Sequence, residues 1–415
     1  MAESLRGETV VLAYSGGLDT SAIVPWLIEH EGCEVVAYVA DVGQGQDELE
    51  GIEAKAIASG ARDCIIDDLR PAFVEEVIWP TLRAGAAYEQ TYLLGTSMAR
   101  PIIARGQVEA ARRVGASGLC HGCTGKGNDQ VRFELTFAAL APDLAIIAPW
   151  RTWSFSGRED LLAYCQAKGV PVTSSVEKIY SRDRNLWHVS HEGGVIEDIS
   201  RPPPDDAWML TADPVEAPET PAVVRIGFES GVPIALDGVS IGGVELIEAL
   251  NTLAGEHGVG RVDLVENRVV GMKSRGLYET PAGTVLFAAA RALEEIVLDA
   301  PSRALKATLG QHLAELIYAG RWWGPSREAQ VAATDVLARD MTGEVELRLY
   351  KGTATATTRS SPRSLYSESI ASFSDADDYS QADAGGFLRL FSLPERLRAG
   401  RETHQVSQGG LGASG

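Results

Sequence analysis

The sequence has few cysteines, a deficit of positive charge and no long hydrophobic run. Five cysteines in 415 residues do not make a disulfide framework, so a reducing, cytoplasmic location is expected. Lys and Arg number 37 against 57 Asp and Glu, which gives a net charge of −20. Nucleic acid is therefore not an expected partner, because its binding normally needs a basic face. No run approaches the roughly 18 apolar residues of a membrane span. The amino-terminal MAESLRGETV lacks the apolar core of a secretory signal.

Short apolar runs alternate with amphipathic segments over the first 175 residues. Continuous apolar strands separated by helices are typical of a parallel sheet covered on both faces. Ligands of such folds bind at the carboxyl ends of the strands. Strands are expected over residues 9–15, 33–43, 63–69, 118–122 and 144–150, and helices near 19–30, 47–59, 71–81, 100–114 and 129–140. A further helix is expected to be capped by Ser156 and Glu159 and to end at Gly169.

The pattern changes from about Tyr180. A proline-rich connection that includes residues 202–204 precedes strand-like segments over 222–228, 261–271 and 344–352 and a long helical pattern over 282–298. We therefore expect a parallel-sheet α/β domain at 1–175, an α+β domain at 176–375 and a C-terminal arm at 376–415. The arm combines a basic, helix-like segment over 394–401 with a glycine- and serine-rich end that is expected to be disordered.

The strongest motif joins the first strand to the first helix. It reads SGGLDTS over residues 15–21. Adjacent glycines allow a tight turn that exposes backbone N–H groups, hydroxyls add neutral donors, and the helix directs its positive end to the same place. These features predict an anion site that needs no lysine. The pattern is neither a Walker loop nor a dinucleotide fingerprint. An ordinary turn that happens to contain glycines is the alternative.

This string resembles the pyrophosphate loop of the PP-loop ATP pyrophosphatases. The resemblance implies a nucleotide-binding domain of the adenine nucleotide alpha hydrolase-like type. In that family the loop grips the β and γ phosphates of ATP while the bond between the α and β phosphates breaks. An AMP-forming ligase is therefore expected, and not a kinase.

Four further strings resemble the argininosuccinate synthase family. They are YLLGTSMARP at 92–101, HGCTGKGNDQVRF at 121–133, YSRDRNLWHVS at 180–190, and ENR at 266–268 with GLYETP at 276–281. Together with the loop, the resemblance runs from about residue 9 to about residue 398. It implies that ATP, L-citrulline and L-aspartate give argininosuccinate, AMP and pyrophosphate through a citrullyl-adenylate. Whether that reaction serves arginine biosynthesis or a urea cycle depends on the organism.

The resemblance also assigns residues to each substrate. Glu266 is a suitable counter-ion for the citrulline ammonium, and Asp129 for that of aspartate. The ATP set is Ala13, Tyr14, Ser15, Gly16, Gly17, Leu18, Asp19, Thr20, Ser21, Ala40 and Gly122. The citrulline set is Tyr92, Ser97, Asn128, Arg132, Ser181, Ser190, Glu266 and Tyr278, and the aspartate set is Thr124, Asn128 and Asp129. The residues expected to take part in catalysis are Asp129, Asp19 and Ser15.

That Asp129 helps to deprotonate the aspartate amine is a hypothesis. Mg²⁺ is expected to arrive with ATP, since the phosphates supply much of its coordination. No protein ligand for the metal and no prosthetic group is assigned. Four predicted citrulline contacts follow the last strand of the first domain, so the site is expected between domains.

Other readings of the sequence remain open. Cys120 and Cys123 have CxxC spacing, but a zinc site needs four ligands and a second pair is missing, so a buried strand residue is expected at Cys120. His188 and His191 are expected on the surface or in loops. Trp322 and its neighbour are expected to pack or to contact another subunit, and the acidic run over 375–378 to form a solvated turn.

The sequence leaves two alternative functions to consider and predicts an oligomeric assembly. The rivals are another PP-loop enzyme, such as a tRNA-modifying ligase or thiolase, and a non-catalytic nucleotide-binding protein on the same fold. The charge of −20 argues against the first, and the long site strings argue against the second. By resemblance the chain forms a homotetramer that uses the second domain and the C-terminal arm. The basic segment over 394–401 is consistent with contact to an acidic neighbour.

Overall fold

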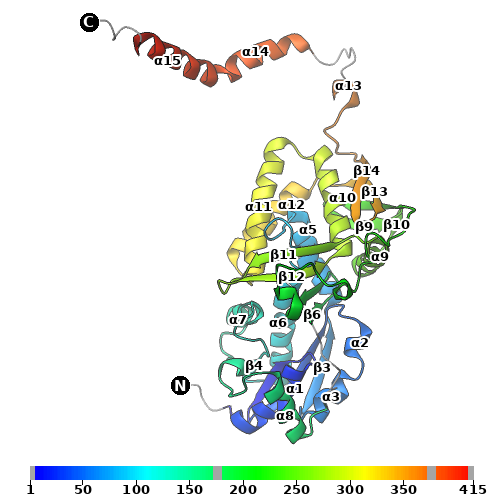
Figure 1. Cartoon of the computed structure of the whole chain (residues 1–415), viewed down its shortest axis with the longest axis vertical. Helices are drawn as coiled ribbons and strands as arrows, with labels where there is room; N and C mark the ends of the chain where they lie inside the picture. The colour runs from blue at the N-terminus through cyan, green and yellow to red at the C-terminus, as the bar shows by residue number, and fades with distance from the viewer. Residues whose placement is uncertain (1–4, 172–179, 372–379, 410–415) are drawn as a thin grey trace. The chain divides into compact units, whose positions relative to one another are not determined.

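The computed structural model of the chain describes residues 5–171, 180–371 and 380–409 (Figure 1). The chain packs as two units, Met1–Arg363 and Ser364–Gly415, called here the main unit and the C-terminal unit. Within the described ranges, no helix has the length and apolar character needed to cross a bilayer. The main unit mixes a parallel sheet with antiparallel sheets, as the sequence predicts.

A five-stranded parallel sheet forms the amino-terminal part of the main unit. Its order is β3-β2-β1-β4-β5, and each neighbouring pair is parallel. The strands are β1 Thr9–Ala13, β2 Glu34–Asp41, β3 Asp63–Asp68, β4 Gly118–Cys120 and β5 Ala145–Ile147. The strand order reverses between β1 and β4. The carboxyl ends of these two strands therefore border the crevice in which such sheets bind ligands.

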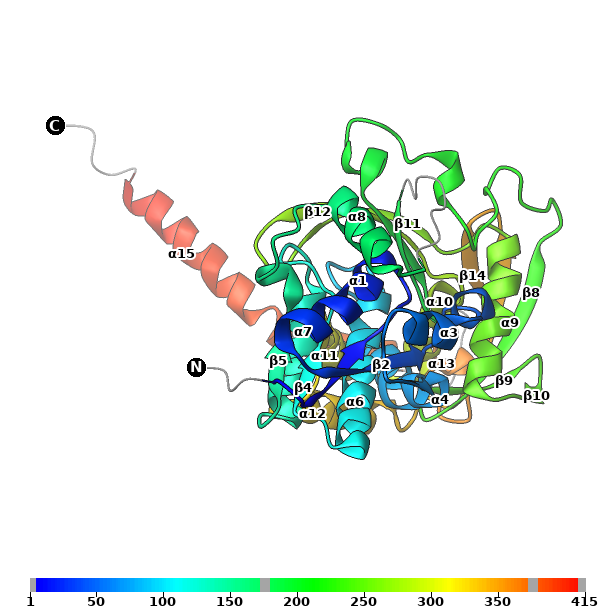
Figure 2. The same cartoon turned by 90° about the horizontal axis from the view of Figure 1, so that it is seen from below.

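Helices cover both faces of this sheet, because successive strand residues point to opposite sides. Val10 and Leu12 pack with Ile23 of α1, whereas Val11 packs on the other face with Ile102 of α6. Figure 2 shows α1 and α8 on one side of the sheet and α6 on the other. The helices are α1 Leu18–Trp26, α2 Gln46–Leu49, α3 Ile52–Ala58, α4 Arg70–Phe73, α5 Trp79–Ala84, α6 Gly95–Val114, α7 Asp129–Leu140 and α8 Arg158–Lys168. π-helical turns Leu27–Glu31 and Val74–Ile78 extend α1 and join α4 to α5.

A four-stranded antiparallel sheet lies between the parallel sheet and the helices of the second half (Figure 1). It runs β11-β12-β7-β6 and consists of β6 Ser181–Arg184, β7 Val189–Glu192, β11 Arg261–Asn267 and β12 Lys273–Glu279. Ser190 pairs with Asp183 on one side and with Tyr278 on the other. Directly paired residues share a face of the sheet, so these three side chains point the same way.

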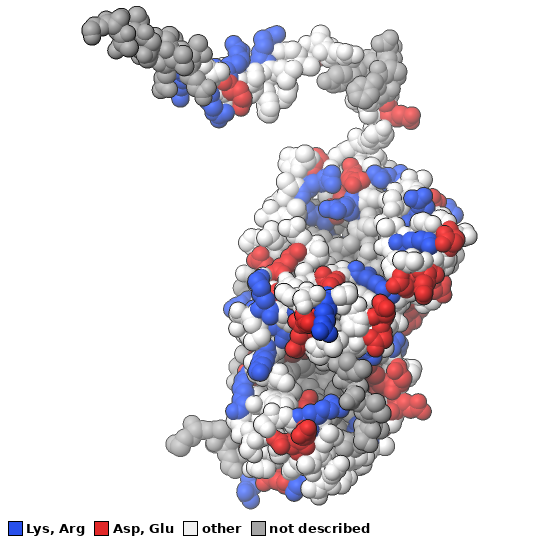
Figure 3. Space-filling model, in the orientation of Figure 1, with Lys and Arg blue, Asp and Glu red and all other residues white. Residues whose placement is uncertain are grey.

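A second antiparallel sheet and four helices complete the main unit. The sheet runs β10-β9-β8-β13-β14. Its strands are β8 Ala222–Glu229, β9 Val232–Leu236, β10 Val239–Ser240, β13 Gly343–Tyr350 and β14 Thr353–Ser360. The helices are α9 Gly243–Glu256, α10 Pro281–Val297, α11 Ala300–Tyr318 and α12 Pro325–Ala338, and short 3-10 turns cover Pro149–Arg151, Gly194–Glu197 and Asp205–Ala207. On the face that Figure 3 shows, positive and negative side chains are interspersed over this unit.

The C-terminal unit contains α13 Glu368–Ala371, α14 Gln381–Phe391 and α15 Leu393–Gly409. The basic segment over 394–401 is therefore helical, as predicted. Large apolar side chains of α14 are exposed, among them Phe387 at 60%, Leu390 at 77% and Phe391 at 70%. The acidic run over 375–378 and the last six residues lie outside the described residues.

Some expected element boundaries are wrong. The helix expected over 47–59 is two helices, because Gly51 adopts left-handed backbone with φ +72° between α2 and α3. The capping box expected from Ser156 and Glu159 does not form. Gly157 is the N-cap of α8, and Asp160 accepts hydrogen bonds from the N–H and hydroxyl of Ser156. The strand expected over 261–271 ends at Asn267 and turns back into β12.

His188 lies in the loop between β6 and β7, which is one of the two expected placements, but His191 is a residue of β7, so the prediction is wrong for His191. Both histidines are fully buried. Short polar contacts inside the core explain this: His188 Nε2 lies 2.9 Å from Thr96 Oγ1, and His191 Nε2 lies 2.7 Å from Glu279 Oε1. By contrast, Cys120 is a buried strand residue and Trp322 is 2% exposed and packed in the core, as predicted.

Candidate active site

The loop between β1 and α1 is shaped by its own side chains. Ser15 Oγ lies 3.2 Å from Thr20 Oγ1 and accepts a hydrogen bond from the Gly17 N–H at 3.4 Å. Gly16 has φ +69°, and a Cβ at this position would lie 3.3 Å from Ile52. A glycine is favoured here because it tolerates this backbone and this close packing. The loop thus leaves the amino end of α1 open to an anion.

A cavity of about 520 Å³ lies at the carboxyl ends of β1 and β4 and is bounded by the first antiparallel sheet. It brings together most of the residues that the sequence singled out. These are Ala13, Tyr14, Ser15, Gly17, Asp19, Thr20, Ala40, Tyr92, Gly122, Thr124, Asn128, Asp129, Arg132, Ser181, Ser190, Glu266 and Tyr278.

Four predicted residues do not line the cavity: Gly16, Leu18, Ser21 and Ser97. Ser21 is buried behind the phosphate loop, where its hydroxyl lies 3.1 Å from Tyr14 Oη. Ser97 is fully buried in α6, and its hydroxyl has no hydrogen-bond partner among the described residues. Both serines therefore lie behind the cavity surface.

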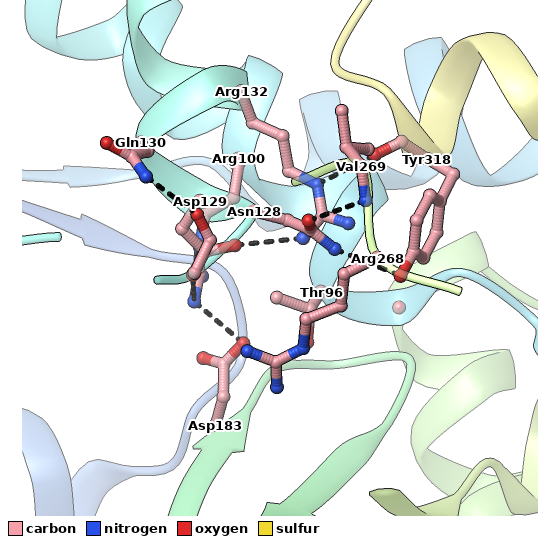
Figure 4. A network of polar contacts seen from close by, with 12 residues as sticks. Thr96, Arg100, Asn128, Asp129, Gln130, Arg132, Asp183, Arg268, Val269 and Tyr318 are labelled. Carbon is pink, nitrogen blue, oxygen red and sulfur yellow. Dashed lines mark hydrogen bonds and ion pairs between the residues drawn. The ribbon is translucent and has the colours of Figure 1, made fainter. Parts of the chain in front are cut away.

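The glycine-rich loop after β4 connects the two halves of the cavity wall. Gln130 closes this loop by donating from Nε2 to the Gly125 carbonyl at 2.7 Å. Asn128 donates from Nδ2 to Tyr318 Oη at 2.9 Å and accepts from the Val269 N–H at 3.0 Å (Figure 4). The Asn128 amide therefore ties the start of α7 to α11 and to the turn between β11 and β12.

Four charged side chains form what we call the charge chain, Arg132–Asp129–Arg100–Asp183 (Figure 4). Asp129 Oδ1 accepts from Arg132 Nη1 and Asp129 Oδ2 from Arg100 Nε, both at 2.9 Å. Arg100 Nη2 donates to Asp183 Oδ2 at 2.8 Å. Burial raises the pKa of Asp129, but the two guanidinium groups outweigh burial and lower it below its ordinary value. Asp129 is therefore an ionised carboxylate that faces the cavity.

A second carboxylate in the cavity has a different environment. Glu266 is 4% exposed. Its Oε1 accepts from Tyr278 Oη at 2.7 Å, while its Oε2 has no hydrogen bond within the described residues. The Tyr92 and Tyr278 rings contact each other in a tilted arrangement with centroids 4.3 Å apart. A buried polar atom without a partner is costly, so this oxygen is suited to a donor that a ligand brings.

Several cavity residues were missed by sequence reasoning. Arg100, Asp183 and Arg268 line the cavity and stand inside the motif strings, so their charges within those strings were a signal that could have found them. Tyr318 also lines it, but no motif surrounds it. Lys55 was missed as well. It does not line the cavity, but its Nζ donates to the Gly16 carbonyl of the phosphate loop.

Comparisons with known proteins match the chain to one family over most of its length. Residues 9–171 match the family model "Arginosuccinate synthase N-terminal HUP domain", and residues 180–398 match "Arginosuccinate synthase C-terminal domain". The argininosuccinate synthase of Idiomarina loihiensis is 57% identical over 390 residues, which cover 94% of this chain and 97% of that protein. The chloroplastic argininosuccinate synthase of Arabidopsis thaliana is 55% identical over 397 residues, which cover 95% and 80%. The chain belongs to the argininosuccinate synthase family.

Argininosuccinate synthases are ligases that join citrulline to aspartate with ATP, and the HUP assignment confirms the PP-loop fold. The use of ATP agrees with the shape of the loop after β1. A solved U34-tRNA thiolase of Methanococcus maripaludis is similar over 42% of this chain and 61% of its own, at 14% identity and a TM-score of 0.29. At this TM-score the likeness says nothing about the function of this chain.

Proposed function

We propose that this chain catalyses the ATP-dependent ligation of L-citrulline and L-aspartate through a citrullyl-adenylate. The observation that carries the proposal is that one cavity holds an anion-binding loop and, among its carboxylates, Asp129 and Glu266, which have different neighbours. Those features suit one triphosphate and two amino acids. The ureido oxygen of citrulline attacks the α-phosphorus, and pyrophosphate leaves. The aspartate ammonium first loses a proton to water, and the resulting amine attacks the ureido carbon. AMP then leaves, and the same nitrogen loses a second proton to give the guanidinium group of the product.

The phosphate loop is proposed to bind ATP. Its backbone N–H groups and the positive end of α1 favour the β and γ phosphates, and Ala40 and Gly122 line the cavity from the ends of β2 and β4. Ser15 and Thr20 supply neutral donors on the same loop. Positioning and charge stabilisation are the contributions that this arrangement can make to the first step.

Glu266 and Tyr278 are proposed to bind the α-amino end of citrulline. The free oxygen of Glu266 is the acceptor that an ammonium needs. Ser181 and Ser190 line the same wall from β6 and β7. Their hydroxyls suit a neutral ureido group, which offers hydrogen bonds and no charge. Because Ser97 lies behind the surface, we expect it to support this wall and not to line it.

Thr124 and Asp129 are proposed to bind aspartate. The hydroxyl suits a substrate carboxylate, and Asp129 suits its ammonium. Both Asp129 oxygens already accept hydrogen bonds from arginines, and its pKa is lowered. These features favour ammonium binding by Asp129 over proton removal from the amine, because a weakly basic carboxylate is a poor proton acceptor.

Mg²⁺ is proposed to enter with ATP. In the described part of the chain, no group of three or more His, Cys, Asp or Glu side chains is placed to hold a metal ion. A magnesium ion on ATP needs few protein ligands, because phosphates and water fill most of its octahedral shell. Asp19, a carboxylate on the phosphate loop that lines the cavity, is suitably placed to act as one such ligand. No prosthetic group is needed for either step.

Location and domain limits are also proposals. All five cysteines are free, which fits a reducing cytoplasm. The two family matches end at residue 171 and begin again at residue 180, on either side of the proposed boundary between the domains 1–175 and 176–375. The arm over 376–415 falls in the C-terminal unit.

Isotope tracing tests the adenylate directly. Citrulline labelled with ¹⁸O in the ureido group is expected to transfer its label to AMP, since the ureido oxygen bonds to the α-phosphorus and leaves with it. Mass spectrometry of AMP and pyrophosphate measures the transfer. Appearance of the ¹⁸O label in water or in pyrophosphate, in place of AMP, would contradict the proposed route.

A further inference from the structure

Asp183 is a member of the charge chain whose place the proposed substrate contacts do not explain. It faces the cavity from β6, and its carboxylate accepts a hydrogen bond from Arg100. We propose that Asp183 sets the amino-group selectivity of the aspartate site by neutralising Arg100. This inference rests on the proposed binding of the aspartate ammonium at Asp129.

The charges of the chain give the physical reason. Arg132, Asp129 and Arg100 alone carry a net charge of +1, which would oppose the approach of an ammonium group. Asp183 brings the sum to zero. The side chains of Arg100 and Asp183 are only 15% and 29% exposed, so water screens their interaction less than it screens a surface pair. Asp129 can therefore accept a third donor although it already binds two arginines.

The register of the sheet explains how Asp183 reaches this position. Asp183 is paired with Ser190, and Ser190 is paired with Tyr278. The sheet that builds the citrulline wall thus also carries the acid that neutralises Arg100. Two other arginines on the cavity wall have carboxylate partners of their own: Arg268 contacts Glu192, and Arg184 lies 3.8 Å from Asp47. Asp183 is therefore a positioning residue that acts on Asp129 through Arg100.

A comparison of two ligands isolates this role. L-Aspartate and succinate carry the same two carboxylates and differ by the ammonium group. In the wild-type protein, the KM for aspartate is expected to lie well below the inhibition constant of succinate. In Asp183→Asn, the preference for aspartate is expected to fall roughly tenfold, because an uncompensated positive charge penalises the ammonium alone. Succinate is expected to inhibit as well as before or better.

The matched control is Asp143→Asn. Asp143 also pairs with an arginine of α6, Arg112, but this pair is exposed and lies outside the cavity. The control is expected to keep the wild-type ratio. Citrulline-dependent exchange of labelled pyrophosphate into ATP, measured without aspartate, is expected to persist in both variants because it reports the first step only.

A double variant distinguishes the effect of the lost charge from a general disturbance of the fold. Arg100→Met combined with Asp183→Asn restores a net charge of zero and leaves Arg132 to hold Asp129. It is expected to regain part of the aspartate preference that Asp183→Asn loses. Three results would each overturn the proposal. The first is an unchanged preference for aspartate over succinate in Asp183→Asn, and the second is a double variant with no more preference than the single one. The third is a loss of pyrophosphate exchange that parallels the loss of preference. Failure of the wild-type protein to show citrulline-dependent exchange would instead overturn the proposed function.

Discussion

Two carboxylates that share one cavity are made different by their immediate neighbours. Asp129 accepts from two arginines, whereas Glu266 accepts from one tyrosine and keeps one oxygen free. An ammonium at Glu266 would satisfy a buried atom that has no other partner. An ammonium at Asp129 would join a network that is already complete. We therefore expect substrate binding to depend more strongly on the Glu266 charge than on any other single group of the citrulline wall.

The first prediction concerns that charge. Glu266→Gln is expected to raise the KM for citrulline roughly tenfold to a hundredfold, because hydrogen bonds to a charged group contribute about 1.5–3 kcal/mol. The KM for ATP is expected to stay unchanged. Steady-state kinetics with each substrate varied in turn measure both values. Glu229→Gln, at an exposed position of β8, is the control. Equal changes in both KM values would contradict the assignment.

At the scale of helices and strands, the packing of several elements buries the His188 side chain. It stands between β6 and β7, and it contacts Thr96 of α6 and stacks against Tyr278 of β12. Burial lowers the pKa of His188 to about 4. The unfolded chain therefore binds more protons than the folded chain between about pH 6.5 and pH 4. Stability linked to His188 is complete above that window and is lost as the pH falls through it.

The lowered pKa of His188 predicts how the unfolding free energy changes with pH. Between pH 7 and pH 5, the wild-type protein is expected to lose about 2 kcal/mol more unfolding free energy than His188→Gln. Urea unfolding at the two pH values measures the difference. An equal loss in both proteins would show that His188 is not the group responsible.

The helices and strands differ in how well the sequence predicts them. The strands of the parallel sheet were predictable because residues such as Val10 to Leu12 form short apolar runs beside glycines. The break at Gly51 was not, because its left-handed backbone depends on the local turn. Most cavity residues followed from long motifs. Tyr318 and the partnership of Arg100 with Asp183 did not, because they depend on elements far apart in the chain that meet only in the folded structure.

At the scale of the whole molecule, α14 presents an exposed apolar face. Phe387, Leu390 and Phe391 are each more than half exposed, and apolar patches on monomers are normally small. We propose that second copies of the chain cover this face in a homotetramer. Phe387→Asp combined with Phe391→Asp is expected to yield a smaller assembly by light scattering. Gln381→Ala on the same helix is the control and is expected to keep the wild-type mass. A tetrameric mass in the double variant would contradict the role of the arm.

The most direct test of the proposed reaction is pyrophosphate release by the purified protein with MgATP. Citrulline and aspartate are added singly and together, and the amino-acid products are identified. We predict sustained turnover only with both amino acids, in which AMP, pyrophosphate and argininosuccinate form in equal amounts. Sustained turnover with citrulline absent, or with another acceptor in its place, would keep the chemistry of the phosphate loop and contradict the substrate assignment.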